Sequence, residues 1–311
     1  MVCRMSSCQD NSCFRYKDSA TCVDKLFPCG KAPRFWSVNW SAAVLHLVNA
    51  LLMLFLWSVS DNKDSTYRLT ETYAPWVATV NNTCVPPTIK ISDEWCLARK
   101  TKVTEELSLW WLIIGFHGLS FIFQTLSMVT CPVLGKMDYI DQVTMSGTNS
   151  LRMLEYSVSA SLMQIAIALL LGVWQSLVIT AIFFLTATTM FLGLLAEKLR
   201  RVDICLAWFA HIIGWFSMIG VWVIIGRQFV FTIIESPNRP PAFVYVIVSV
   251  IGLLYSVFGF IQFYQLYKTD KIPDNKLNPY VEMLYCVNSL VSKTFLGWMI
   301  FSNALVGVAQ S

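Results

Sequence analysis

The last apolar stretch of the chain contains a single charged side chain, Lys293. No other charged residue occurs from Met283 to Ser311. An ammonium group at the centre of a bilayer costs about 2.5–3.5 kcal/mol on insertion scales, so an intramembrane lysine indicates a chemical role. A buried lysine loses its proton readily and can then attack an aldehyde to form a Schiff base. Lys293 is therefore predicted to hold a chromophore inside a helical bundle.

A second internal charge, Glu155, is expected near Lys293. Counting about 1.5 Å per residue from the expected helix ends places Lys293 roughly 18 Å deep and Glu155 and His46 each roughly 15 Å deep. A lysine and a carboxylate at similar depth predict an ion pair, and such pairs in membranes usually mark function. The alternative is a salt bridge that only joins the third and seventh helices, although buried salt bridges stabilise poorly. Ser289 precedes Lys293 by four residues and shares its helix face, so its hydroxyl is predicted beside the lysine nitrogen.

Composition and hydropathy place these residues in a membrane protein. The chain is 56% hydrophobic and only 14% charged over 311 residues. Apolar stretches of the length that crosses a bilayer predict an all-α, seven-transmembrane-helix bundle, with a tight turn near 172–176 between the third and fourth helices. The expected spans are Trp36–Ser58, Leu107–Val129, about Gly147–Gly172, Gln175–Ala196, Ile204–Gly226, Pro241–Tyr267 and about Val281–Ala309. A count of six or eight spans would also be possible but would divide the apolar stretches less simply.

Basic residues in the short loops predict the orientation. They lie between the fourth and fifth spans and between the sixth and seventh, and the tail after Lys293 has none. Because cytoplasmic loops are enriched in lysine and arginine, the N-terminus is predicted inside and the C-terminus outside. The residues concerned are Lys198, Arg200, Arg201, Lys268, Lys271 and Lys276. The expected location is a multi-pass protein of the plasma membrane.

Two segments outside the helices carry further signals. The loop at about 59–106 would be extracellular, where Asn81 begins a glycosylation sequon and Cys84 and Cys96 could form a disulfide. Residues 1–35 contain five cysteines but no apolar core of a secretory signal, which predicts a retained cytoplasmic tail. These cysteines lack a Cys-x-x-Cys pair and a nearby histidine, so no metal site is expected and free or acylated thiols are the simpler interpretation.

Two stretches resemble the heliorhodopsin family. The run from Asn288 to Leu305, NSLVSKTFLGWMIFSNAL, looks like the family's last helix, in which a Ser-Leu-x-x-Lys segment is followed by Trp-x-Ile-Phe-x-Asn. The run from Glu155 to Met163, EYSVSASLM, is similar to the family's third-helix Glu-Tyr-Ser stretch. Fainter similarity extends to His46-Leu47, Gly193, Glu197, Phe243-Val244-Tyr245 and the run from Gln262 to Gln265. Family members also have a cytoplasmic N-terminus, as the loop charges suggest independently.

The resemblance implies a retinal-binding site. Lys293 would bind all-trans retinal, Glu155 would be the counterion and Ser289 a neighbouring hydrogen-bonding group. An opposite charge within about 4–6 Å favours a protonated nitrogen in a low-dielectric site, which agrees with this role for Glu155. Family alignment, the helix-face rule and depth suggest further pocket residues: Thr189, Met190, Gly193, Trp215, Tyr255 and Phe258. A homodimer is also implied, whereas no signalling partner can be named.

The family also carries a cytoplasmic polar cluster with histidines from the first two helices. His46 matches the first position, but the second aligns with Gln124, with Ser120 one turn earlier. The expected cluster is therefore His46, Ser120 and Gln124. His117 lies two turns from Gln124 and is expected to be a satisfied structural group, so a proton-accepting role for the two histidines is in doubt.

Light sensing is the function that these residues favour. Isomerisation beside Glu155 would bias the bundle between two states, as a photosensory receptor requires. Pumping is disfavoured because the other carboxylates, Glu105, Glu106, Glu197 and Glu282, are expected near helix ends. Light-gated passive proton conduction is the main alternative, and a seven-helix receptor or transporter without a chromophore is another. No catalytic triad or phosphate-binding loop indicates an enzyme, and no nucleic-acid partner is expected.

Overall fold

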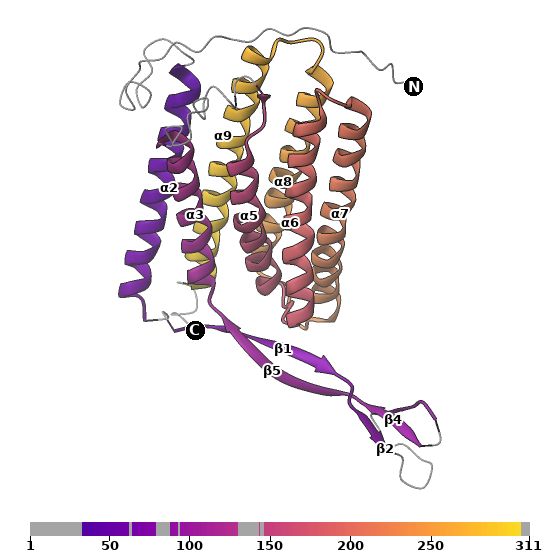
Figure 1. The fold of residues 1–311 in the computed structure, drawn as a ribbon. Helices are drawn as coiled ribbons and strands as arrows, with labels where there is room; N and C mark the ends of the chain where they lie inside the picture. Colours follow the sequence, from indigo (N-terminus) through magenta and orange to yellow (C-terminus); the bar gives the residue numbers. More distant parts are fainter. Residues whose placement is uncertain are drawn as a thin grey trace.

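Seven long helices stand side by side in the computed structural model, which describes residues 33–61, 64–78, 88–92, 94–129, 143 and 146–305 (Figure 1). In that part of the chain, seven helices are long and apolar enough to cross a membrane. They are α2 (Pro33–Val59), α3 (Leu109–Val129), α5 (Ser150–Leu170), α6 (Ser176–Leu199), α7 (Ile204–Glu235), α8 (Ala242–Lys268) and α9 (Asp274–Ile300). The prediction of a seven-helix, multi-pass integral membrane protein is confirmed.

Helices α5 and α9 form the interior of the bundle. In α5, 78% of the most apolar window is buried and in α9 50%, against 28–39% in the other five spans. Helix α5 packs on α3 and α6, while α9 packs on α2 and α8. Glu155 and Lys293 therefore lie on the two helices with the least lipid exposure, where a charge must find a partner within the protein.

The last helix begins earlier than expected. Helix α9 starts at Asp274 instead of about Val281, and a π-helical turn, Phe301–Leu305, follows its end at Ile300. The expected start left Asp274 and Lys276 in the preceding loop, but Asp274 pairs with the buried Arg200 and belongs to the first turn of α9. Helix α7 likewise continues beyond Gly226 to Glu235. Charge is a poor marker of a helix end where the charge is compensated.

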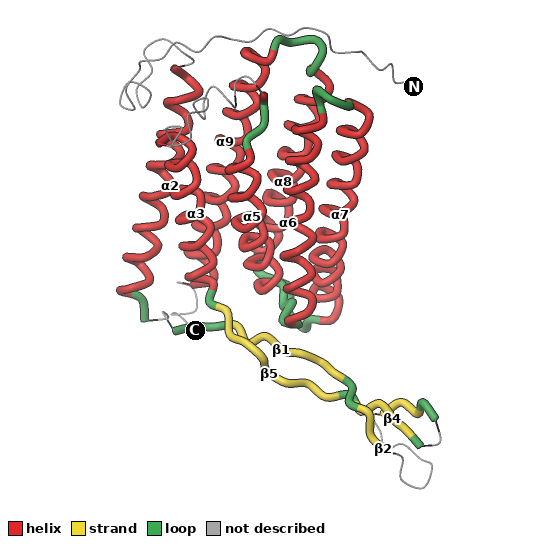
Figure 2. Tube along the Cα trace, viewed as in Figure 1, coloured by secondary structure: helices red, strands yellow, loops and turns green. Residues whose placement is uncertain are grey.

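The connection between α2 and α3 contains strands, whereas the sequence predicts only a loop there. Strands β1 (Tyr67–Tyr73) and β5 (Lys100–Leu107) pair antiparallel, and Leu107 belongs to β5 instead of the second helix. Strands β2 (Trp76–Ala78), β4 (Trp95–Ala98) and β3 (Thr88–Lys90) form a second sheet in the order β2-β4-β3. Threonine, valine and tyrosine in β1 and β5 favour extended backbone. Both sheets project from one end of the bundle, called here the strand end, and the opposite end is the far end (Figure 2).

The predicted tight turn between the third and fourth spans lies at the strand end. Helix α5 ends at Leu170 and α6 begins at Ser176. Gly172 has a φ of 82°, a left-handed conformation that favours glycine. The backbone N–H of Thr70 donates to the carbonyl of Trp174 at 2.7 Å. This bond fixes β1 to the turn and so to the bundle.

Several predictions concern residues outside the described part of the chain. Asn81, Cys84 and the tail at 1–32 are among them, so glycosylation, the Cys84–Cys96 pairing and the cytoplasmic tail stay predictions. Cys96 itself is disulfide-bonded. Cys205 is also disulfide-bonded and begins α7 at the far end, so disulfides alone do not orient the protein in the membrane.

Candidate functional site

Lys293 and Glu155 form an ion pair in the interior of the bundle. The Nζ atom of Lys293 lies 2.5 Å from Oε1 of Glu155 and 2.5 Å from Oγ of Ser120. The Ser120 hydroxyl also donates to Oε1 of Glu155 at 2.7 Å. All three residues are at most 2% exposed. The lysine nitrogen is thus held by one carboxylate and one hydroxyl, from α5 and α3, in a water-poor site.

Ser120, from the expected polar cluster, occupies the position that sequence analysis predicts for Ser289. The Ser289 hydroxyl lies one turn before Lys293 and lines the cavity beside it, but it has no hydrogen-bond partner in the described part of the chain. Helix periodicity correctly gives its face but does not give the direction of the lysine side chain, which turns toward α3. Ser289 therefore contributes an unpaired hydroxyl to the cavity wall.

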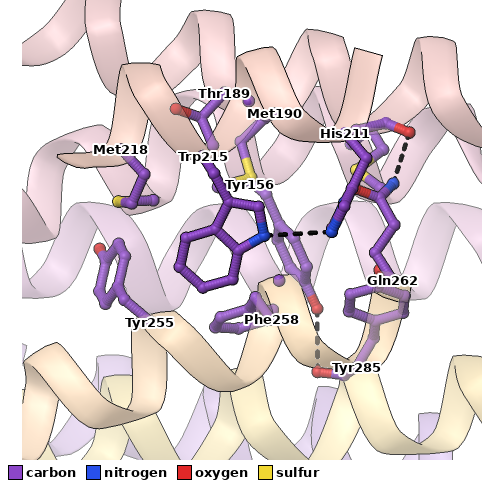
Figure 3. A pocket seen from close by; sticks show the side chains of 14 residues that line it. Tyr156, Thr189, Met190, His211, Trp215, Met218, Tyr255, Phe258, Gln262 and Tyr285 are labelled. Carbon is purple, nitrogen blue, oxygen red and sulfur yellow. Dashed lines mark hydrogen bonds between the residues drawn. The ribbon is translucent and has the colours of Figure 1, made fainter. Parts of the chain in front are cut away.

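A cavity extends from Lys293 between α5, α6, α7 and α8. Its inner part is lined by Lys293 and Ser289, and its outer part by Trp215 and His211. Both parts share four walls: Tyr156, Met190, Tyr255 and Phe258. The shared residues join the two parts into one slot, with the lysine in its inner part. Figure 3 shows the outer part.

All six pocket residues suggested by the sequence line this slot: Thr189, Met190, Gly193, Trp215, Tyr255 and Phe258. Further residues that line the outer part were not predicted: Met153, Tyr156, His211, Gly214, Met218, Gly259, Gln262 and Tyr285. A signal for three of them was present, because His211 and Met218 lie one turn from Trp215, and Gln262 lies one turn from Phe258. The one-turn rule extended to both sides would have found them.

The walls of the slot are flat and apolar. The Tyr255 hydroxyl donates to the Ala160 carbonyl at 2.8 Å, and the Tyr156 hydroxyl donates to the Tyr285 carbonyl at 3.1 Å. Both tyrosines therefore turn their polar atoms to backbone and their rings to the cavity. Aromatic and methionine walls with a reactive amine at one end fit a conjugated apolar aldehyde such as retinal.

The outer part of the slot is held by a chain of hydrogen bonds. Trp215 Nε1 donates to His211 Nε2 at 3.1 Å, and His211 Nδ1 donates to Gln262 Oε1 at 3.0 Å. Gln262 Nε2 then donates to the Gly193 carbonyl at 2.7 Å. His211 is thereby fixed as the neutral Nδ1–H tautomer. The Trp215 indole packs against Gly259, where a Cβ atom would overlap its ring.

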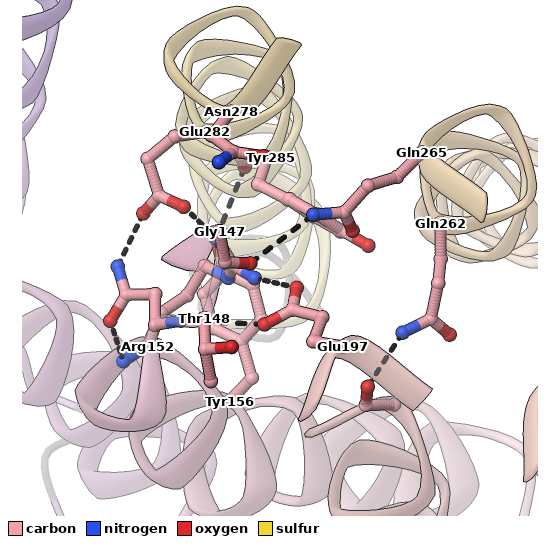
Figure 4. Close-up of polar contacts among 12 residues, drawn as sticks. Gly147, Thr148, Arg152, Tyr156, Glu197, Gln262, Gln265, Asn278, Glu282 and Tyr285 are labelled. Atoms are coloured by element: carbon pink, nitrogen blue, oxygen red, sulfur yellow. Dashed lines mark hydrogen bonds and ion pairs between the residues drawn. The ribbon is translucent and has the colours of Figure 1, made fainter. Parts of the chain in front are cut away.

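A buried ion network lies between the slot and the far end (Figure 4). Arg152 pairs with Glu197 of α6 and Glu282 of α9, and Asn149 donates to Glu282. Asn149 also caps α5 by accepting from the Arg152 backbone N–H at 2.8 Å. Glu197 is 1% exposed and Glu282 4%. Glu197 lies close to the end of α6 at Leu199, as expected, although it is buried. The expectation that Glu282 lies near a helix end is wrong, because Arg152 compensates its charge well inside α9.

A second buried arginine closes the far end. Arg200 donates to the Ser146 carbonyl at 3.0 Å, Asp274 at 3.1 Å and Asn278 at 2.9 Å. Burial lowers the pKa of Arg200, and the Asp274 carboxylate opposes that shift. Gly147 has a φ of 65°, and a Cβ there would overlap Arg200 and Asn278. Position 147 therefore requires glycine, because it lies against the Arg200–Asn278 hydrogen bond that joins α6 to α9.

The expected cluster of His46, Ser120 and Gln124 is divided among three places. His46 Nδ1 lies 3.0 Å from His117 Nδ1, and both histidines are 0% exposed. Ser120 binds Lys293, whereas Gln124 lines a separate cavity on the far side, with Glu155 and Arg152. Gln124 is seven residues from His117 on α3, about 10.5 Å along the helix, so His46 pairs at a different level. His117, predicted to be a satisfied structural group, thus has His46 as a partner.

Comparison with known proteins agrees with this geometry. The chain is similar in fold to the transmembrane domain and linker region of Salpingoeca rosetta rhodopsin phosphodiesterase, with a TM-score of 0.59 and 13% identity over 89% of this chain and 81% of that one. A structure of that transmembrane domain alone gives a TM-score of 0.52 at 13% identity, over 89% and 88% of the two chains. At this identity the likeness shows the fold alone, and no curated protein sequence matches the chain. The sequence model of heliorhodopsins matches residues 35–305, so the chain belongs to the heliorhodopsin family, which implies a retinal chromophore.

Proposed function

We propose that this heliorhodopsin is a light-sensing photoreceptor in which all-trans retinal is bound to Lys293. The observation that carries the proposal is the position of Lys293 in the wall of an aromatic-lined cavity, 2.5 Å from a buried carboxylate. When bound, retinal supplies light absorption and a change of double-bond geometry. The protein's own residues then determine how that change is used.

Glu155 and Ser120 set the charge at the lysine nitrogen. Glu155 favours a proton on that nitrogen because the opposite charge is adjacent and water is excluded. Ser120 accepts a hydrogen bond from the lysine nitrogen and donates one to Glu155. These two bonds fix the position of the nitrogen relative to the carboxylate. Movement of Glu155 or Ser120 would change how well the charge on the lysine nitrogen is stabilised, because an unpaired charge in a low-dielectric interior costs free energy.

Tyr285 is placed to pass such a change to the far end of the bundle. Its ring stacks with that of Phe258 at 6.1 Å between centres, and the Arg152 guanidinium lies 4.1 Å from its ring centre. Arg152 in turn holds Glu197 and Glu282. The loop charges support a far end that faces the cytoplasm, in the plasma membrane, where a signalling partner would bind. Family resemblance supports a homodimer.

The test is a visible absorption spectrum after all-trans retinal is added to the purified protein. A band above about 450 nm that is absent in Lys293→Ala would support a protonated Schiff base on Lys293. Absence of the band in folded protein would contradict the photoreceptor proposal. Lys293 and Glu155 would then be interpreted as part of a receptor or transporter without a chromophore.

Passive proton conduction in the light is the second candidate. Polar groups lie on both sides of Lys293: the cavity of Gln124 and Arg152 toward the far end, and the His46–His117 pair toward the strand end. Voltage-clamp currents that reverse with the proton gradient would support conduction. Their absence, together with a normal photocycle, would favour sensing alone.

A further inference from the structure

An exposed column of aromatic rings follows the outer face of α8 toward the far end. Phe260, Phe263 and Tyr267 are spaced three and four residues apart, which places them on one face of the helix. Their exposed fractions are 59%, 48% and 52%, so the rings face the surroundings of the bundle. On a helix that crosses a membrane such a face contacts lipid, and a tyrosine in the last turn lies at the level of the lipid headgroups.

The Tyr267 ring is held in place by its neighbours. It stacks with the Phe263 ring, with 6.4 Å between ring centres and an interplanar angle of 14°. Trp208 of α7 makes a T-shaped contact with Phe263 at 5.1 Å. The column is therefore anchored to a second helix, and Tyr267 has a defined position although half of its surface is exposed.

Two lysines place their ammonium groups beside the Tyr267 ring. The Nζ atom of Lys271 lies 3.8 Å from the ring centre and that of Lys268 lies 5.4 Å from it. Both distances are within the range of a cation–π contact. The backbone N–H of Lys271 donates to the Lys268 carbonyl at 3.0 Å, which places the two residues one turn apart. The ring thus gathers two positive charges that repel each other.

Neither ammonium group is neutralised by a carboxylate in the described part of the chain. Asp270, which lies between the two lysines in sequence, pairs with Arg201 at 3.8 Å. Asp274 pairs with Arg201 at 2.6 Å and with Arg200 at 3.1 Å. Both carboxylates therefore have arginine partners. An anion shared by the two ammonium groups would remove their repulsion.

The position of the two ammonium groups favours a lipid as the source of that anion. They lie at the end of α8, next to rings that face the acyl chains of the bilayer. The phosphate of an anionic phospholipid can accept from both ammonium groups while its acyl chain lies along Phe263 and Phe260. In the proposed orientation this end faces the cytoplasmic leaflet, where anionic lipids are concentrated.

We propose that Lys268, Lys271 and Tyr267 bind the headgroup of an anionic phospholipid at the far end of α8. The two lysines bind the phosphate, and the Tyr267 ring orients them. The general preference for basic residues in cytoplasmic loops accounts for lysine at this end, but not for two ammonium groups beside one exposed ring. Lys198 and Lys276, at the same end, have no such ring in the part of the chain that the structure describes. A lipid site of this kind does not require a chromophore.

Native mass spectrometry of the full chain in detergent measures the binding of added phosphatidylglycerol, with phosphatidylcholine as the neutral comparison. For the unmodified protein we expect one tightly bound phosphatidylglycerol and weaker binding of phosphatidylcholine. Lys268→Gln combined with Lys271→Gln should weaken binding of the first phosphatidylglycerol by about 30-fold, which corresponds to about 1 kcal/mol for each lysine. Tyr267→Leu should weaken it less, because both charges remain but lose the ring that orients them.

The matched control is Lys198→Gln combined with Lys276→Gln, which removes the same charge from the same end and should leave the first lipid bound. The unfolding temperature should be unchanged in both double variants, because none of the four lysines is buried. Equal weakening in the two double variants would show an effect of net charge and overturn the site. Equal affinity for the two lipids would also overturn it, as would displacement of the lipid by an equal concentration of inorganic phosphate.

Discussion

The Arg152 guanidinium lies 4.1 Å from the centre of the Tyr285 ring, which joins the cavity wall to the buried ion network. Tyr285 borders the slot, and Arg152 pairs with carboxylates from α6 and α9. A single cation thus connects three helices, α5, α6 and α9, and contacts an aromatic side chain of the site. Removal of the Arg152 side chain should therefore reduce the stability of the protein more than it shifts the visible absorption band.

Arg152→Gln is expected to lower the free energy of unfolding by about 3–5 kcal/mol, because Glu197 and Glu282 would remain buried without a counter-charge. Denaturant unfolding in detergent micelles measures this loss. Arg68→Gln is the matched control, since Arg68 pairs with Glu106 on an exposed part of β1 and β5 and should cost at most about 1 kcal/mol. Equal losses in both variants would contradict the buried role of Arg152.

Glu155→Gln should shift the visible band. It should also lower the pH at which the Lys293 nitrogen loses its proton, compared with the unmodified protein. The reason is that the neutral amide no longer favours a positive charge on the Lys293 nitrogen. Absorption spectra recorded across a pH titration measure both effects. Glu106→Gln, on the exposed strand β5, should leave the band and its titration unchanged. A Glu155→Gln spectrum identical to that control would remove Glu155 from the counterion role.

The seven spans could be predicted from sequence because a run of about twenty apolar residues matches the thickness of a bilayer and is rare outside membranes. Lys293 and Glu155 could be singled out for a related reason, since uncompensated charges are rare in such stretches. The start of α9 could not be predicted by the same logic. Asp274 resembles a loop residue until Arg200, distant in sequence, is seen beside it.

The histidines show a second limit of sequence reasoning. Depth counting gives the level of a residue only as accurately as the helix end is known, and it says nothing of the partner helix. His46 therefore appears level with Glu155 in the sequence, whereas in the structure it pairs with His117. Strands β1 and β5 were missed because hydropathy identifies membrane spans but not polar hairpins outside them.

Ser120→Ala should alter the pigment more than Ser289→Ala. Ser120 accepts from the Lys293 nitrogen and donates to Glu155, whereas the Ser289 hydroxyl has no partner in the described part of the chain. A hydrogen bond to a charged group contributes about 1.5–3 kcal/mol, so its loss should lower the pH at which the protonated band disappears by about one to two pH units. Parallel titrations of the two variants measure the difference. A larger effect from Ser289→Ala would show that the nitrogen lies toward Ser289 once retinal is bound.

Gly259→Ala should disrupt the outer part of the slot. A Cβ at this position would overlap the Trp215 ring, which must then move and lose its bond to His211. Overpacking of this kind costs about 1–3 kcal/mol, and the displaced indole would enter the cavity. We expect a lower absorbance per molecule after retinal is added, together with a lower unfolding temperature.

Gly252→Ala is the matched control on the same helix, two turns away. A Cβ at Gly252 would lie 3.6 Å from the Trp222 ring, an ordinary contact. Alanine also favours a helix over glycine by about 1 kcal/mol, so this variant should bind retinal normally and unfold at the same or a higher temperature. If both variants form pigment equally well, Trp215 does not need to pack on Gly259, and the outer wall of the slot tolerates a displaced indole.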